Sequence, residues 1–160
     1  MNPVLLATDG SPTAEQATET AIELARLLDT ELVVTTVWNI PYTTGGLAPA
    51  PMSGDLAKLS EEDANKTAFK AAAIAEEAGV ETRTMVLRGF PVEEICLAAD
   101  ATKPRFLVIG SHGWGAVKRA VFGSVSTGVL HHARCPVVVV RADPVEVMTA
   151  TKGTTSVGVA

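Results

Sequence analysis

Short apolar runs alternate along the chain with longer segments in which apolar residues recur at helical spacing. The first run, Val4–Ala7, is typical of a strand that is buried on both faces, as the strands of parallel sheets are. Four further runs share its richness in β-branched and aliphatic residues. We predict strands over residues 4–7, 31–38, 81–87, 105–110 and 137–140.

The segments between these strands carry signals that start and stop helices. Ser11 followed by Pro12 supplies a side-chain cap and a preset φ for the first helix. Gly79 stands where a residue with positive φ would end the second helix. We predict helices from Pro12 to near Asp29, over Asp55–Ala78, from Pro91 to Lys103 and over Ser124–Ala133. Residues 39–54 are rich in proline and glycine and are predicted to form a loop.

The predicted elements alternate between strand and helix along the chain. Such alternation predicts a single-domain α/β fold with an open, five-stranded parallel sheet and helices on both faces, a Rossmann-like architecture. Ligands of these sheets bind beyond the carboxyl ends of the strands, where the strand order reverses. In this chain that position falls at the ends of the first and fourth strands, next to Asp9 and Gly110.

The composition fits such a domain and narrows the class of protein. The chain has 160 residues, of which 47% are hydrophobic and 4% aromatic, so the length fits one domain and the apolar content excludes a disordered chain. The two cysteines, Cys96 and Cys135, belong to no metal-binding pattern and are predicted to be small buried residues in a reducing compartment. Because no signal peptide and no long apolar stretch is visible, we expect a cytoplasmic protein.

The charge of the chain is acidic overall but unevenly distributed. A net charge of −5 disfavours nucleic acid or an anionic membrane as a partner, because binders of polyanions are usually basic. Residues 101–142, however, contain six lysines and arginines and no acidic residue. This local excess favours a small anionic ligand and a solvated charged surface equally.

Two glycine-rich stretches in the same segment point to phosphate. Gly110–Gly115 follows a predicted buried strand, and Gly123–Gly128 opens a predicted helix. Glycine lets the backbone approach a ligand closely, and the N–H groups at the start of a helix attract an anion. The hydroxyl groups of Ser124 and Ser126 would add further donors. We predict a phosphate cradle; the alternative is a tight turn followed by a serine cap.

Three familiar catalytic or nucleotide-binding signatures are missing from these stretches. Ala116 and Val117 stand where a P-loop needs Lys and Ser or Thr. Lys118 occupies the third glycine position of the dinucleotide fingerprint, and Ser124 occupies the first glycine position of the nucleophile elbow. A P-loop hydrolase, a dinucleotide-dependent dehydrogenase and a serine esterase are therefore disfavoured.

The spacing Gly110-x2-Gly113-x9-Gly123-Ser124 resembles the ATP-binding motif G-x2-G-x9-G-[ST] of the universal stress protein family. The chain is also similar to that family in Asp9-Gly10-Ser11 after the first strand and in the sequence HHARCPVVVVR near its end. The resemblance covers residues 1–142 and implies one domain with an adenine-nucleotide alpha hydrolase-like fold. Residues 143–160 are expected to be a flexible tail. Because every position of the motif is kept, the chain resembles the ATP-binding subgroup.

The resemblance implies that ATP, with or without Mg²⁺, lies across the ends of the first and fourth strands. Asp9 is expected to bind the ribose, with an Asx turn as its alternative role. Val37 is expected to meet the adenine through its backbone, with a place in the core as the alternative. Gly110 and Gly113 are expected to line the ribose and the phosphates. The full set of expected site residues is Ala7, Thr8, Asp9, Val37, Gly110, Ser111, His112, Gly113, Gly123, Ser124, Val125 and Ser126.

A second copy of the chain is the expected protein partner. As an edge strand, Val137–Val140 would leave backbone groups and valines exposed, and pairing with the same strand of another copy would cover both. The resemblance implies such a homodimer. No nucleic acid and no membrane is expected as a partner.

The sequence leaves three functions to be distinguished. No evident pair of nucleophile and base and no metal cluster accompanies the cradle, so the leading hypothesis is a nucleotide-dependent stress-response sensor or regulator. The alternative is a slow ATP hydrolase or adenylyl-transfer enzyme that uses Asp9 or His112, although a histidine in such a loop more often braces it. The third is an interaction module that binds no nucleotide and whose glycines are structural.

Overall fold

The computed structural model describes residues 2–39, 54–112 and 122–141, and these residues contain nine regular elements. The loop predicted over residues 39–54, except at its two ends, and the tail predicted over 143–160 lie outside the described part of the chain. The strands are β1 (Val4–Ala7), β2 (Leu32–Trp38), β3 (Thr82–Arg88), β4 (Phe106–Gly110) and β5 (Val137–Val140). The helices are α1 (Pro12–Leu27), α2 (Gly54–Glu77), α3 (Pro91–Thr102) and α4 (Ser124–His132).

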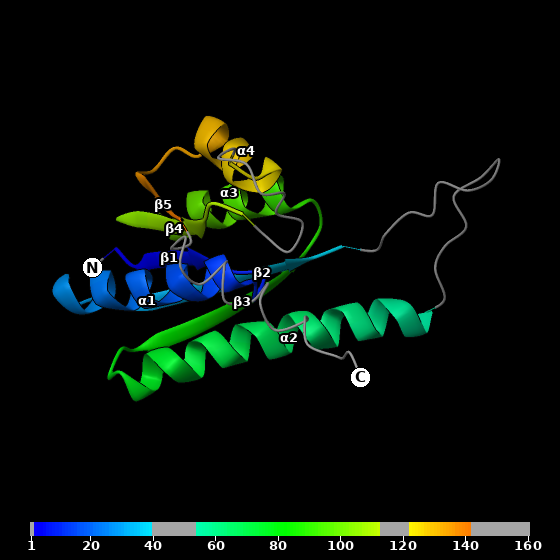
Figure 1. Ribbon diagram of the computed structural model, residues 1–160, viewed down its shortest axis with the longest axis horizontal. Helices are drawn as coiled ribbons and strands as arrows, with labels where there is room; N and C mark the ends of the chain where they lie inside the picture. The colour runs from blue at the N-terminus through cyan, green and yellow to red at the C-terminus, as the bar shows by residue number, and fades with distance from the viewer. Residues whose placement is uncertain (1, 40–53, 113–121, 142–160) are drawn as a thin grey trace, which may run out of the picture.

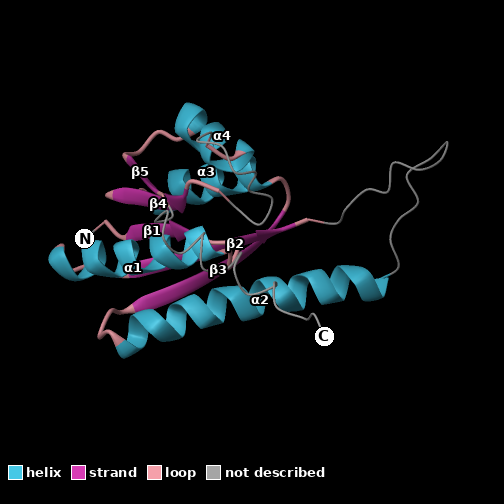
Figure 2. Cartoon of the chain, viewed as in Figure 1, coloured by secondary structure: helices cyan, strands magenta, loops and turns pink. Residues whose placement is uncertain are grey.

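The five strands form one parallel sheet in the order β3-β2-β1-β4-β5, as the arrows in Figure 2 show. From β1 the chain moves outward in one direction through β2 and β3, and then returns to place β4 and β5 on the other side of β1. The order therefore reverses between β1 and β4, whose residues Val4 and Phe106 are paired in register. This confirms the predicted fold class and the predicted position of the switch point.

Helices cover both faces of the sheet, with α1 and α2 on one side and α3 and α4 on the other (Figure 1). Successive residues of β1 point to opposite faces, so Val4 and Leu6 join the core beneath α1 and α2, while Leu5 and Ala7 join the core beneath α3 and α4. All four are buried, which explains why the strand is apolar at every position. The helices contribute mainly alanine to these cores, which lets them pack close to the strands.

The predicted start and stop signals operate where the sequence places them. The Ser11 hydroxyl accepts a hydrogen bond from the Ala14 N–H at 3.3 Å, and Pro12 is the first residue of α1. Gly79 adopts a φ of 79° directly beyond α2, and Lys103 ends α3 in the same left-handed region. No helix in the described part of the chain is both long and apolar enough to cross a membrane.

Candidate functional site

The turn between β1 and α1 holds Asp9 in a defined position at the carboxyl edge of the sheet. The Thr8 N–H donates to the Thr35 carbonyl at 2.9 Å, which extends the pairing of β1 with β2. Gly10 then adopts a φ of 73°, and the Ser11 N–H donates to Asp9 Oδ1 at 3.0 Å. This is the Asx turn that the sequence offers as an alternative role for Asp9. The turn presents the exposed Asp9 side chain beside the switch point.

The end of β4 packs directly on the start of α1. A Cβ atom added at Gly110 would lie 3.1 Å from backbone atoms of Thr13 and Ala14, so only glycine fits there without a shift. The Ser11 hydroxyl lies 3.4 Å from the His112 carbonyl, which links the loops that follow β1 and β4. Gly110 is therefore needed for close packing of the end of β4 on the first turn of α1, whatever ligand binds there.

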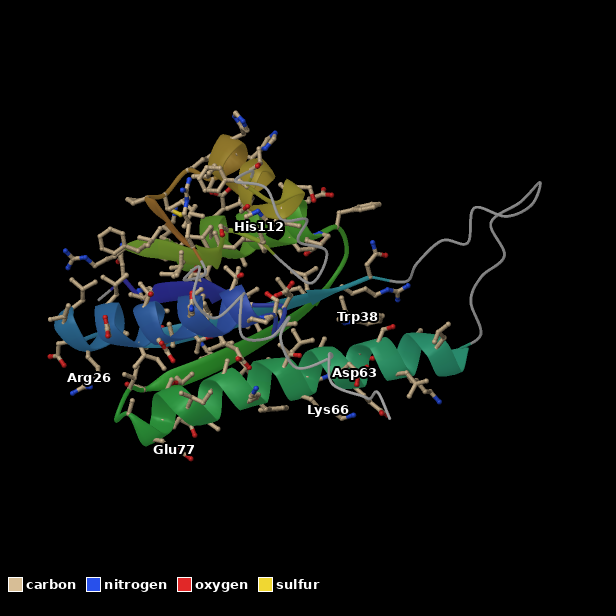
Figure 3. The ribbon with its side chains drawn as sticks, viewed as in Figure 1. Arg26, Trp38, Asp63, Lys66, Glu77 and His112 are labelled. Carbon is tan, nitrogen blue, oxygen red and sulfur yellow. The ribbon has the colours of Figure 1, made fainter. Side chains whose placement is uncertain are left out.

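Ser111 and His112 connect this edge to β5 and to one another. The Ser111 N–H donates to the Val140 carbonyl at 2.7 Å, and Ser111 Oγ lies 3.0 Å from His112 Nδ1. The Ser111 side chain is fully buried, while His112 is partly exposed at the edge (Figure 3). The hydrogen bond sets the orientation of the His112 ring.

The start of α4 folds back onto the end of β4. The Gly123 N–H donates to the Ser111 carbonyl at 2.7 Å, and the buried Ser126 hydroxyl lies 2.9 Å from the same oxygen. A Cβ atom added at Gly123 would lie 3.2 Å from that carbonyl oxygen. The two glycine-rich stretches are thus in contact, although Ser111 and Gly123 lie far apart in the sequence. The Ser126 hydroxyl supports this contact.

The geometry of α4 leaves donors at its first turn. The first hydrogen bond within the helix runs from the Thr127 N–H to the Gly123 carbonyl at 3.0 Å. The N–H groups of Ser124, Val125 and Ser126 precede it, so they have no acceptor inside the helix. Together with the helix dipole, they form an arrangement suited to an anion.

A cavity of about 770 Å³ continues from Asp9 into the space between α1 and α2. The ends of the central strands provide its inner wall, and α1 and α2 provide its sides. Across the two helices, Lys70 Nζ lies 2.6 Å from Glu15 Oε1 in an exposed ion pair. The residues of the inner wall are Thr8, Asp9, Gly10, Thr36, Val37 and Trp38.

Two features of this cavity are not apparent from the sequence. Thr36 is 4% exposed, and its hydroxyl has no hydrogen-bond partner among the described residues. The Trp38 ring is stacked against the Arg88 guanidinium, whose carbon lies 5.4 Å from the ring centroid. Both depend on the pairing of β2 with its neighbours, which no local signal reveals.

The structure brings most of the expected site residues to one edge of the sheet. Those at the ends of β1 and β4 and at the start of α4 gather at the switch point, and Val37 lies one strand away, in the cavity wall. The partly buried Val37 side chain packs against the core under α3. Gly113 lies outside the described residues, as do Lys118 and Arg119.

The locally basic segment is less positive in the fold than in the sequence. Arg134 lies 3.6 Å from Asp100 of α3, and Arg141 stacks on Phe122 at 5.1 Å from the ring centroid. Asp100 of α3 thus partly neutralises the positive charge of residues 101–142. Local charge alone therefore gives weaker support for an anion site than the donors of α4 give.

The two cysteines lie in a mildly acidic, partly buried environment near Asp100. Burial raises the pKa of both thiols, and the negative charge of Asp100 raises the pKa of each a little further. Cys96 and Cys135 are only partly buried, which corrects the expectation that they are buried residues. Within the described residues, no three or more Cys, His, Asp or Glu side chains gather as metal ligands.

Comparisons with known proteins agree with this geometry. Residues 1–141 match the model of the universal stress protein family. Universal stress protein MJ0531 of Methanocaldococcus jannaschii is 33% identical over 139 residues, which cover 86% of this chain and 81% of that protein. The structure of the hypothetical protein MJ0577 superposes with a TM-score of 0.74 at 27% identity and covers 89% of this chain and 96% of that chain.

A further solved structure contains a nucleotide. The universal stress protein from Archaeoglobus fulgidus in complex with dAMP is 26% identical, with a TM-score of 0.60, and the match covers 88% of this chain and 98% of that chain.

Proposed function

The chain belongs to the universal stress protein family, and on that premise we propose that it binds an adenine nucleotide, ATP in the first place, across the carboxyl ends of β1 and β4. The observation that carries the proposal is the hydrogen bond from the Gly123 N–H to the Ser111 carbonyl at 2.7 Å. This bond places the first turn of α4 directly beside the end of β4, where a ligand of such a sheet binds.

Different residues of the chain would bind the phosphates, the ribose and the base. The N–H groups of Ser124, Val125 and Ser126 would hold the phosphates. The absence of a Cβ atom at Gly123 lets the first turn of α4 lie close to Ser111 and His112. Asp9, fixed by its Asx turn, would accept hydrogen bonds from the ribose hydroxyl groups. Val37 would meet the base through its backbone. A Mg²⁺ ion, where present, would neutralise phosphate charge and arrive with the nucleotide.

We propose a regulatory role for this binding rather than rapid turnover. Ser111 is 1% exposed, so its hydroxyl cannot reach a substrate even though it lies close to His112. Asp9 is already engaged in the turn before α1. These contacts favour binding over rapid hydrolysis of ATP. We therefore propose a nucleotide-dependent sensor of the stress response, and we expect it in the cytoplasm.

The proposed regulator is a homodimer. β5 lies at one edge of the sheet, and all four of its valines are only half-buried. Antiparallel or parallel pairing with β5 of a second copy would satisfy the backbone and cover these side chains. The site and the proposed interface are adjacent, because the Ser111 N–H donates to Val140 at the end of β5.

Calorimetric titration with ATP tests the proposal, and Gly123→Val is the informative variant. A valine side chain at this position would meet the Ser111 carbonyl and obstruct the cradle, so the affinity for ATP is expected to fall at least about 100-fold. Gly79→Ala is the matched control, since Gly79 lies at the opposite end of the sheet with open space around its Cβ position. That variant should bind ATP like the parent. A parent protein that shows no binding up to millimolar ATP would refute the proposal.

A further inference from the structure

Trp38 places an aromatic ring in the wall of the cavity between α1 and α2, which Asp9 also lines. It is the last residue of β2, it is partly buried, and it lines the 770 Å³ cavity together with Asp9 and Val37. Figure 3 shows it at the tip of β2, on the side of the sheet along which α2 runs. None of the roles assigned above uses this ring.

The ring is held in place by the neighbouring strand. Trp38 and Arg88 are partners in the register of β2 and β3, and the Gly89 N–H donates to the Trp38 carbonyl at 3.0 Å. The Arg88 guanidinium lies over the ring, at 5.4 Å from its centroid. A ring fixed by its backbone and by a cation on one face loses little freedom when a ligand binds to the other face.

We propose that Trp38 is the platform on which the base of the bound nucleotide stacks, an inference that rests on the nucleotide-binding function proposed above. Asp9, Val37 and Trp38 line the same cavity, so a nucleotide whose ribose is bound by Asp9 could extend its base toward the Trp38 ring. Stacking on an aromatic face accepts any planar base and favours the larger purine rings. Trp38 thus supplies affinity, while hydrogen bonds to the backbone supply the choice of base.

Fluorescence gives the first test, because the chain contains only two tryptophans. In a Trp114→Phe variant, Trp38 is the sole tryptophan, and ATP should quench its emission with a midpoint equal to the Kd from calorimetry. If calorimetry detects ATP binding but the Trp38 emission stays unchanged at saturation, the stacking is refuted and the nucleotide site itself stands. If the parent protein binds no ATP by calorimetry, the proposed function fails first.

Affinity gives the second test and does not depend on Trp114. Trp38→Leu removes the ring and should weaken ATP binding roughly 10-fold, whereas Trp38→Phe keeps a ring and should stay within about 3-fold of the parent. Circular dichroism shows whether each variant is folded. Equal ATP affinity in the parent and a folded Trp38→Leu variant would overturn the proposal. If that variant does not fold, the Trp38→Phe affinity and the emission of the Trp114→Phe variant decide.

Discussion

The two ends of the sheet resemble each other in parts but differ in what they can bind. Each has a glycine with positive φ, Gly10 at 73° and Gly79 at 79°, and each opens into a cavity, of about 770 Å³ at the carboxyl end and about 450 Å³ at the amino end. At the carboxyl end α4 begins, and its first N–H groups lie next to β4. At the amino end α1 and α2 finish, beside Asp29, Glu31 and Glu81.

The direction of the helices explains this difference. In a parallel α/β sheet each helix starts at the carboxyl edge and ends at the amino edge, so the positive ends of the helix dipoles gather at one edge only. The acidic residues at the amino edge add to the negative ends of α1 and α2, and the arginines there offset only part of this charge: Arg26 lines the cavity, and Arg83 lies 3.4 Å from Glu31. An anionic ligand is therefore favoured at the carboxyl edge and disfavoured at the amino edge, although both edges have room for one.

We expect the largest difference in stability between the two edges when a glycine is replaced by alanine. Gly110→Ala would push a Cβ atom to 3.1 Å from backbone atoms of α1, which cannot move aside like a side chain, so we expect a loss of about 2–3 kcal/mol in the free energy of unfolding. Gly79→Ala meets open space and should cost only about 1 kcal/mol, for its left-handed φ. Urea unfolding of both variants measures the difference. Equal losses would contradict the close packing described at the carboxyl edge.

The next comparison is between an aspartate at the carboxyl edge, Asp9, and an aspartate at the amino edge, Asp29. Asp9→Asn keeps the acceptor of the Asx turn but removes the charge, so ATP affinity is expected to fall roughly 10-fold as a charge-assisted hydrogen bond is weakened. Asp29→Asn is the matched control at the amino edge, where asparagine tolerates the φ of 49°. It should leave ATP affinity unchanged in calorimetry. A larger loss of ATP affinity in Asp29→Asn than in Asp9→Asn would indicate that ATP binds at the amino edge, which would contradict the proposed site.

Two threonines provide the smallest effects, with opposite signs. Thr36→Val replaces a buried hydroxyl that has no partner in the described part of the chain, so the free energy of unfolding should rise by about 1 kcal/mol. Thr82→Val at the amino edge removes a hydroxyl that donates to the Val80 carbonyl at 2.9 Å, so stability should fall by about 1 kcal/mol. Thermal or urea unfolding distinguishes the two. A loss of stability in Thr36→Val would mean that its hydroxyl is satisfied in solution.

The fold follows from sequence signals that act locally, whereas part of the site does not. The apolar runs predict the five described strands, and the caps at Ser11 and Gly79 predict the start of α1 and the end of α2. Helix α1 ends at Leu27, two residues before the predicted end, with Leu28 as its cap. The glycine spacing predicts the start of α4 as a site. The cavity between α1 and α2 depends on how two helices pack across the sheet, and so it has no local signature.

The contacts that sequence reasoning missed are between elements that are distant in the chain. Trp38 and Arg88 meet because β2 and β3 pair in one particular register. Arg134 meets Asp100 because α3 and the loop after α4 lie together, which changes the charge that the segment presents. In both cases the side chains are visible in the sequence, but their partners follow only from the fold.

Amide chemical shifts during a titration with ATP report both edges of the sheet in one experiment. We expect saturable shifts for the N–H groups of Ser124, Val125 and Ser126 and for Asp9, while Gly79, Val80 and Glu81 stay unchanged. Shifts confined to the amino edge, or no shift at the start of α4 at saturating ATP, would contradict the proposed site.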